Sequence, residues 1–210
     1  MTAFWAIERE GPVSRFRLDS DDGRQTLSPE LLEDLAAGAA AECARGSAVV
    51  SIESARPGIF AAGADLLRIR GLSGPEAHAY ARRGQDAISA LGRVPAAVVA
   101  AIDGACFGGA LDLAMGCDVR LSSHRSRFCH PGPRLGFITG WGGTVRAPRL
   151  LGAAGARRLF RTGEVFDASF AANLGLIDEV IAVAAWKARR GEIEECLARE
   201  RPLWETKPWI

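Results

Sequence analysis

Short apolar runs alternate along this chain with longer segments in which apolar residues recur at helical spacing. The short runs are typical of strands, and the longer segments are typical of helices that bury one face. We expect an opening hairpin over residues 3–18, followed by alternating strands and helices in an α/β fold. Further strands are expected at residues 47–53, 98–102, 118–123 and 176–183, and helices at residues 28–44, 73–94, 144–161, 167–175 and 186–199.

Two of the expected helices begin at clear capping signals. Ser28 precedes Pro29, and proline is favoured at the first helical position because its missing N–H would have no helical acceptor there. The second of these helices begins near Ser73, and its apolar positions include Tyr80, which we interpret as a core residue. Gly152 interrupts the helical region 144–161.

The central feature is a glycine turn within residues 103–115. The apolar run 98–102 enters this turn, and an amphipathic segment leaves it after Gly108 and Gly109, carrying Asp112 near its start. A strand that turns through glycines into a helix leaves backbone N–H groups without acceptors, so the turn can hold negative charge. Two simpler interpretations stay open: the glycines can serve sterics alone, and Asp112 can cap the helix.

Two other segments have the composition of binding loops. Residues 59–66 are mostly small and surround Gly63, which permits a ligand to approach the main chain, although small residues can also simply fit under a helix. Residues 128–143 form a long passage rich in glycine and proline. Irregular chain of this length inside a compact domain is typical of a binding loop or a pocket wall.

Composition excludes several classes of function. The net charge is +1 over 210 residues, so no strong field attracts nucleic acid or an anionic membrane. No apolar stretch is long enough for a signal peptide or a spanning helix, and the three histidines lack metal-ligand spacing. We therefore expect a cytoplasmic protein with no metal. Five cysteines without a CxxC pair are expected to be buried thiols: Cys43, Cys106, Cys117, Cys129 and Cys196.

Three segments in this order, Phe60–Leu66, Asp103–Asp118 and Leu135–Thr144, resemble the enoyl-CoA hydratase/isomerase (crotonase) family. The resemblance extends over about residues 3 to 183. It implies a spiral of ββα units with two roughly perpendicular sheets and flanking helices, assembled as a homotrimer or a hexamer. On this basis residues 1–183 form the crotonase-like core, and residues 184–210 form a shortened C-terminal helical tail.

The resemblance also implies a chemistry for the two glycine turns. Members of the family bind an acyl-CoA thioester and stabilise its enolate with two backbone N–H groups, which by motif position belong to Ala64 and Gly109. Coenzyme A is then part of the substrate, no cofactor is bound permanently, and an acyl-carrier thioester is a second possible substrate. The residues implied in substrate binding are Ala62, Asp65, Leu66, Gly108, Pro131, Gly132 and Gly140.

The chain departs from the family pattern at the acid/base positions. Many hydratases of the family have two glutamates, whereas Asp112 and Gly132 occupy these positions here. Three interpretations follow: Asp112 alone transfers protons for isomerisation or hydration; a decarboxylase or ring-forming synthase uses the space over Gly132; or the chain binds acyl-CoA without catalysis. His130 is a further candidate proton donor. Trp204 and Trp209 suggest docking against another surface or against the chain's own core.

Overall fold

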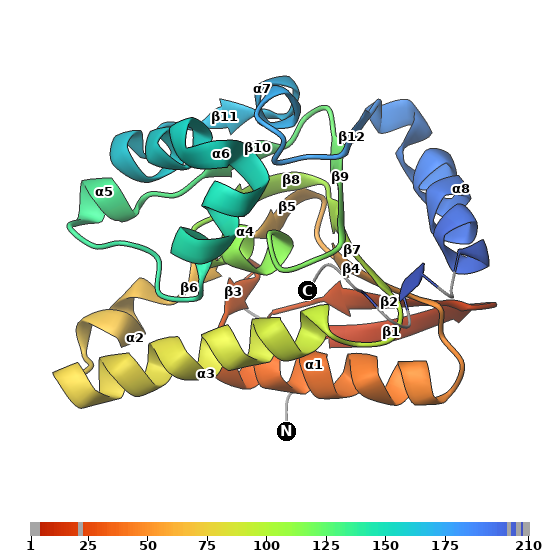
Figure 1. Ribbon diagram of the computed structural model, residues 1–210, viewed down its shortest axis with the longest axis horizontal. Helices are drawn as coiled ribbons and strands as arrows, with labels where there is room; N and C mark the ends of the chain where they lie inside the picture. Colours follow the sequence, from red (N-terminus) through yellow and green to blue (C-terminus); the bar gives the residue numbers. More distant parts are fainter. Residues whose placement is uncertain (1–4, 21–22, 201–202, 205–206, 208–210) are drawn as a thin grey trace.

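Successive strands of this protein divide between two sheets. A computed structural model describes residues 5–20, 23–200, 203–204 and 207. In three consecutive strand pairs the first strand enters a six-stranded sheet and the second enters a four-stranded sheet, which produces a repeating ββα path (Figure 1). The pairs are β4 (Val49–Ser54) with β5 (Gly58–Ala61), β7 (Ala97–Ile102) with β8 (Gly104–Phe107), and β9 (Val119–Ser123) with β10 (Arg127–Cys129).

The six-stranded sheet has the order β1-β2-β4-β7-β9-β12, and only β1 and β2 pair antiparallel. These two strands are the hairpin expected near the start of the chain. The four-stranded sheet has the order β11-β10-β8-β5, and a small parallel ladder joins β3 to β6. The remaining strands are β1 (Trp5–Glu10), β2 (Val13–Leu18), β3 (Thr26–Leu27), β6 (Gly63–Ala64), β11 (Phe166–Asp167) and β12 (Glu179–Ile181).

The long periodic segments form the expected helices. Ser28 caps the first of them by accepting a hydrogen bond from the Leu31 amide at 3.2 Å, and Gly152 breaks the helical geometry of α6 with a φ of 67°. The helices are α1 (Pro29–Ala44), α2 (Leu66–Arg70), α3 (Gly74–Gly92), α4 (Gly109–Ala114), α5 (Gly132–Leu135), α6 (Gly143–Thr162), α7 (Ala168–Asn173) and α8 (Trp186–Arg199), with a 3-10 turn at Val183–Ala185.

The passage 128–143 is less irregular than its composition predicted. Its first residues complete β10, which pairs parallel with β8, and the four-residue helix α5 follows. Hydrogen bonds to a neighbouring strand create β10, so a three-residue segment gives no periodic signal of its own. The remainder, between α5 and α6, is a loop.

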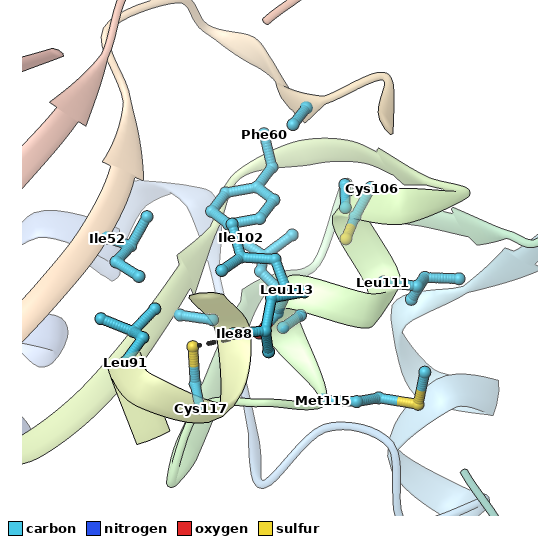
Figure 2. Packing of buried hydrophobic residues seen from close by; sticks show 14 of the residues in the cluster. Ile52, Phe60, Ile88, Leu91, Ile102, Cys106, Leu111, Leu113, Met115 and Cys117 are labelled. Atoms are coloured by element: carbon cyan, nitrogen blue, oxygen red, sulfur yellow. Dashed lines mark hydrogen bonds between the residues drawn. The ribbon is translucent and has the colours of Figure 1, made fainter. Parts of the chain in front are cut away.

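The main core lies between the two sheets and under α3 and α4. Ile88 and Leu91 of α3 pack with Phe60 of β5 and Ile102 of β7, and each of these side chains is at most 1% exposed (Figure 2). Four of the five cysteines are buried as expected. Cys196 is exposed instead, because it lies on a side of α8 that faces away from the sheet.

Helix α8 packs on the other face of the six-stranded sheet (Figure 1). Leu197 joins a second buried cluster with Val49 and Val99 of the sheet, and Trp204 packs against the same cluster. Trp204 therefore docks on the chain's own core, while Trp209 lies outside the described residues.

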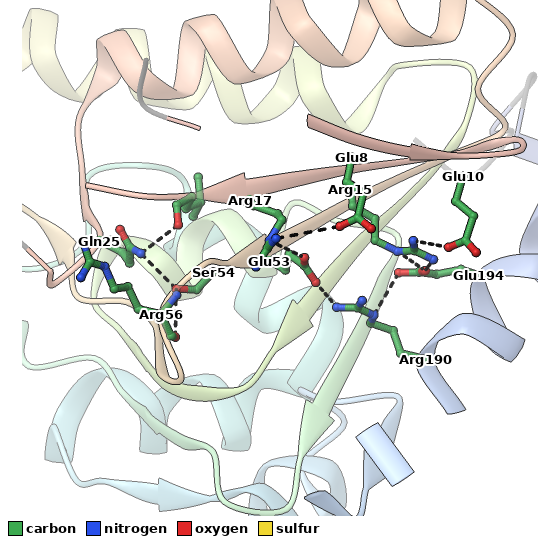
Figure 3. A network of polar contacts seen from close by, with 11 residues as sticks. Glu8, Glu10, Arg15, Arg17, Gln25, Glu53, Ser54, Arg56, Arg190 and Glu194 are labelled. Atoms are coloured by element: carbon green, nitrogen blue, oxygen red, sulfur yellow. Dashed lines mark hydrogen bonds and ion pairs between the residues drawn. The ribbon is translucent and has the colours of Figure 1, made fainter. Parts of the chain in front are cut away.

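A charged network ties α8 to the sheet beneath it (Figure 3). The Glu194 side chain is fully buried, and its Oε2 lies 2.7 Å from Nη2 of Arg15. Arg190 Nε lies 3.6 Å from the other Glu194 oxygen, and Arg190 also donates a hydrogen bond to Glu53 of β4. Arg15 in turn donates to Glu10 at 2.7 Å. Two guanidinium groups thus share one buried carboxylate.

We expect Glu194→Gln to lower the free energy of unfolding by about 3 kcal/mol, because it removes the charge that compensates Arg15 and Arg190 in a buried site. Arg15 still pairs with Glu10 and Arg190 with Glu53, so the expected loss is at the lower end of the range for a broken buried ion pair. Urea unfolding followed by circular dichroism measures it. Glu192→Gln, whose side chain is 65% exposed on the same helix, is the control and changes stability by less than about 0.5 kcal/mol. Equal stability of the two variants would contradict this account.

Candidate active site

The two glycine-containing turns predicted from the sequence pack backbone against backbone. Gly63 has a φ of 90°, and a Cβ at this position would lie 2.5 Å from the carbonyl oxygen of Phe107 and 2.7 Å from the amide nitrogen of Gly109. A Cβ at Gly109 would lie 3.3 Å from the amide nitrogen of Ala64. At position 63 only glycine permits this approach, since real Cβ atoms essentially never come within 3.0 Å of backbone atoms. The backbone groups of Ala64 and Gly109 are therefore neighbours.

The turn before α4 has a conformation that only glycine adopts readily. Gly108 is the N-cap residue with φ 55° and ψ −121°, and its amide donates to the Cys129 carbonyl at 2.9 Å. Gly109 follows as the first helical residue, a position whose amide has no acceptor inside the helix. Ala64 ends β6, directly before Asp65, whose side chain caps α2 by accepting from the Leu67 amide at 2.9 Å.

A cavity of about 600 Å³ opens at these turns. Its wall includes nearly all the residues that the sequence assigned to the site. These are Ala62, Ala64, Asp65, Leu66, Gly108, Gly109, Asp112, Pro131 and Gly140. The structure thus brings together the three sequence segments that carried the family resemblance.

Gly132 is the exception, because it does not line the cavity. It is buried at the start of α5, and a Cβ at this position would lie 2.6 Å from the Phe137 carbonyl oxygen and 3.2 Å from Nδ1 of His130. The Cβ position of Gly132 is therefore not an open space. The neighbouring backbone fills it, which the sequence around this glycine does not reveal.

Asp112 is a buried carboxyl group in the cavity wall. The residue is 1% exposed, and Oδ2 accepts a hydrogen bond from the Thr139 hydroxyl. Oδ1 has no hydrogen-bond partner among the described residues and faces Gly143, where a Cβ would come within 2.2 Å of it. The N-cap of α4 is Gly108 rather than an acidic side chain. Asp112 therefore makes no capping hydrogen bond to α4, although it does lie in the first turn of this helix, where the helix dipole favours a carboxylate.

Burial raises the pKa of Asp112 from 3.8 to about 7. The hydrogen bond from Thr139, the positive charge of Arg146 and the Trp141 backbone amide oppose this shift, because each favours the ionised form. Near neutral pH the protonated and ionised forms of this carboxyl group are therefore both populated. Such a perturbed group in a cavity is typical of proton-transfer sites.

His130 lines the same cavity but is neutral at physiological pH. It is 2% exposed, and its ring forms a T-shaped pair with that of Phe160, with centroids 5.2 Å apart. Burial lowers its pKa to about 4, so the near-neutral pKa on which the proton-donor hypothesis rested is wrong. Within the described part of the chain, no three His, Cys, Asp or Glu side chains are placed to hold a metal ion.

A family model described as Enoyl-CoA hydratase/isomerase matches residues 8–203. The chain belongs to this family. It is 40% identical over 146 residues to a probable enoyl-CoA hydratase 2, mitochondrial, from Arabidopsis thaliana, a match that covers 70% of this chain and 48% of that protein. It is also 41% identical over 133 residues to the fatty acid oxidation complex subunit alpha of Vibrio vulnificus (strain CMCP6), covering 62% of this chain and 19% of that one. The chain thus spans at most about half of these relatives.

Solved structures confirm the crotonase fold for this family member. The enoyl-CoA hydratase from Bacillus anthracis superposes with a TM-score of 0.85 at 28% identity, over 93% of this chain and 76% of the other. Pseudomonas aeruginosa DspI superposes with a TM-score of 0.91 over 99% of this chain and 85% of the other, and at 24% identity this match concerns the fold alone. In the described residues, no helix is long and apolar enough to cross a bilayer.

Three residues of this chain line the cavity but were not predicted from the sequence to do so. Tyr80 was predicted as core and is buried, yet it also lines the cavity. Thr139 and Trp141 lie in the passage predicted to be a pocket wall, but neither was singled out. Apolar residues of α2, of α3, of the turn between these two helices and of the loop before α6 add to the wall: Leu67, Ile69, Leu72, Ala77, Ala81, Phe137 and Ile138.

We expect Thr139→Val to raise the pKa of Asp112 above about 7, because the lost hydroxyl donates to the ionised carboxylate. A hydrogen bond to a charged group is worth about 1.5–3 kcal/mol, which corresponds to about one to two pKa units. NMR titration of the Asp112 carboxyl carbon measures the change. Thr139→Ser keeps the hydroxyl and restores the original midpoint, whereas Thr144→Val, at an exposed position of α6, leaves it unchanged. An unshifted midpoint in Thr139→Val would contradict the assignment.

Proposed function

We propose that this chain is an acyl-CoA-processing enzyme of the enoyl-CoA hydratase/isomerase type. In this proposal the amides of Ala64 and Gly109 stabilise the enolate of a thioester, and Asp112 transfers the proton. Coenzyme A is part of the substrate. The observation that carries the proposal is the meeting of two backbone turns beside one buried carboxyl group with a pKa of about 7.

The amides suit an enolate because charge grows on the thioester oxygen during the reaction. Fixed donors in a cavity stabilise that developing charge more than the neutral ground state, and losing one such donor typically raises a barrier by about 3 to 4 kcal/mol. Gly109 offers an amide at the first turn of α4, and Ala64 offers one from β6. Because the two amides are neighbours, both can donate a hydrogen bond to the same oxygen atom.

One carboxyl group suffices for moving a double bond. The Asp112 carboxylate takes a proton from the α-carbon of a β,γ-unsaturated thioester, and the electron pair of the broken C–H bond enters the enolate. The protonated Asp112 then returns the proton to the γ-carbon, which leaves an α,β-unsaturated thioester. Atoms and charge balance, and no second acid or water is required. A pKa near the working pH lets the same group act in both steps.

Hydration is the second candidate, supported by the names of the relatives. It needs both activation of a water molecule and delivery of a proton, and the second carboxylate of the family pattern is replaced by the enclosed Gly132. We therefore expect hydration to be slower than isomerisation. A decarboxylase or synthase using space over Gly132 is disfavoured by the same enclosure, and binding without catalysis is an outcome that the experiment below detects. A trimeric or hexameric assembly stays a prediction.

A panel of acyl-CoA thioesters tests the proposal. We expect the wild type to convert β,γ-unsaturated thioesters to their conjugated isomers faster than it hydrates the conjugated ones, measured by the enoyl-thioester absorbance and by chromatography of the products. Asp112→Asn is expected to lower turnover by about 100-fold or more while thioester binding is kept, because only the proton carrier is lost.

Asp86→Asn is the matched control, since Asp86 is 67% exposed on α3, and its turnover is expected to equal that of the wild type. Full turnover by Asp112→Asn would eliminate the proton-transfer role. Binding of thioesters by the wild type without any conversion would favour the noncatalytic interpretation instead.

A further inference from the structure

The indole of Trp141 fills the gap between α3 and α4. The residue is 3% exposed and lies at the cavity wall. A Cβ at Gly84 of α3 would lie 2.3 Å from Cδ1 and Nε1 of the indole, and a Cβ at Gly109 of α4 would lie 2.5 Å from Cζ3. The five-membered ring therefore rests on one glycine and the six-membered ring on the other. Each helix has a glycine at the position where Trp141 contacts it.

Other contacts fix this indole in place. The ring of Tyr80, one turn before Gly84 on α3, stacks on it with centroids 5.7 Å apart and an interplanar angle of 28°. The Trp141 carbonyl accepts a hydrogen bond from Arg146 at 2.8 Å, and Arg146 also donates to Ser89 of α3 at 3.1 Å. Tyr80 and Trp141 together form a continuous and well-supported aromatic wall.

The position of this wall bears on the acyl group of the substrate. If the thioester oxygen lies at the Gly109 amide and the α-carbon lies near Asp112, as the proposed function requires, the next acyl carbons run along the six-membered ring of Trp141. This ring already touches Gly109, so it blocks extension of the chain between α3 and α4. Tyr80 blocks the adjoining direction on α3.

We infer that Trp141 is a specificity-determining residue that limits the length of the acyl group, and that the substrates are thioesters of short acyl chains. This inference rests on the proposed function. Removing the indole leaves the two glycines facing each other across an empty gap that a longer apolar chain can enter. Each additional methylene buried there strengthens binding by about fourfold.

Calorimetric binding of the saturated butanoyl-, hexanoyl-, octanoyl- and decanoyl-CoA thioesters tests the inference, because these ligands do not react. For the wild type we expect affinity to stop rising, or to fall, beyond the short members. For Trp141→Ala we expect it to continue rising, so that decanoyl-CoA gains at least tenfold relative to butanoyl-CoA. Trp141→Phe, which removes one ring, should give an intermediate profile, and circular dichroism verifies folding.

Refilling the gap from the opposite side is the decisive control. Gly84→Leu in the Trp141→Ala background places a new side chain where the indole lay and should restore the short-chain profile. Identical length dependence in the wild type and Trp141→Ala, or equal weakening at all lengths that Gly84→Leu does not reverse, overturns the inference. If no thioester binds the wild type, the proposed function itself fails, a result distinct from normal binding with an unchanged length profile.

Discussion

The close approach of two backbone segments is the constraint on which the site depends. At Gly63 the chain has no room for a Cβ, and the missing side chain lets β6 meet the start of α4; at Gly109 the Trp141 indole occupies the space that a Cβ would need. The fold supplies this meeting, because β8 leads directly into α4 while β6 is held by its ladder with β3. Backbone amides placed in this way do not require a side chain of their own. Substitution there acts through shape, since every residue other than proline keeps an N–H group.

The second constraint is the burial of the Asp112 carboxyl group. Its ionised form lowers the free energy of unfolding. Burial raises the pKa of Asp112 from 3.8 to about 7, so the folded protein prefers the protonated form. Below about pH 4 the carboxyl is protonated in both the folded and unfolded states, and this cost vanishes. The cost grows as the pH rises toward 7 and is fully present above it, where the folded state holds a buried charge. Thr139 and Arg146 reduce it by favouring the ionised form.

Features with local signals could be predicted from the sequence. The capped helix after Ser28, the hairpin and the glycine turn before Asp112 each arise from neighbouring residues, and all are found at or near their expected bounds. Features created by distant contacts could not be. The hydrogen bond between Thr139 and Asp112 joins residues 27 positions apart. The enclosure of Gly132 depends on where the Phe137 carbonyl comes to lie, and the lowered pKa of His130 depends on burial by the assembled fold.

The central claim is that the amides of Ala64 and Gly109 both donate hydrogen bonds to the same thioester oxygen. A crystal structure of the protein with a saturated short-chain acyl-CoA tests it most directly. We predict that the thioester oxygen lies about 3 Å from both amide nitrogens, with the α-carbon beside the Asp112 carboxyl group. A bound thioester whose oxygen is out of hydrogen-bonding range of one or both amides would contradict the account.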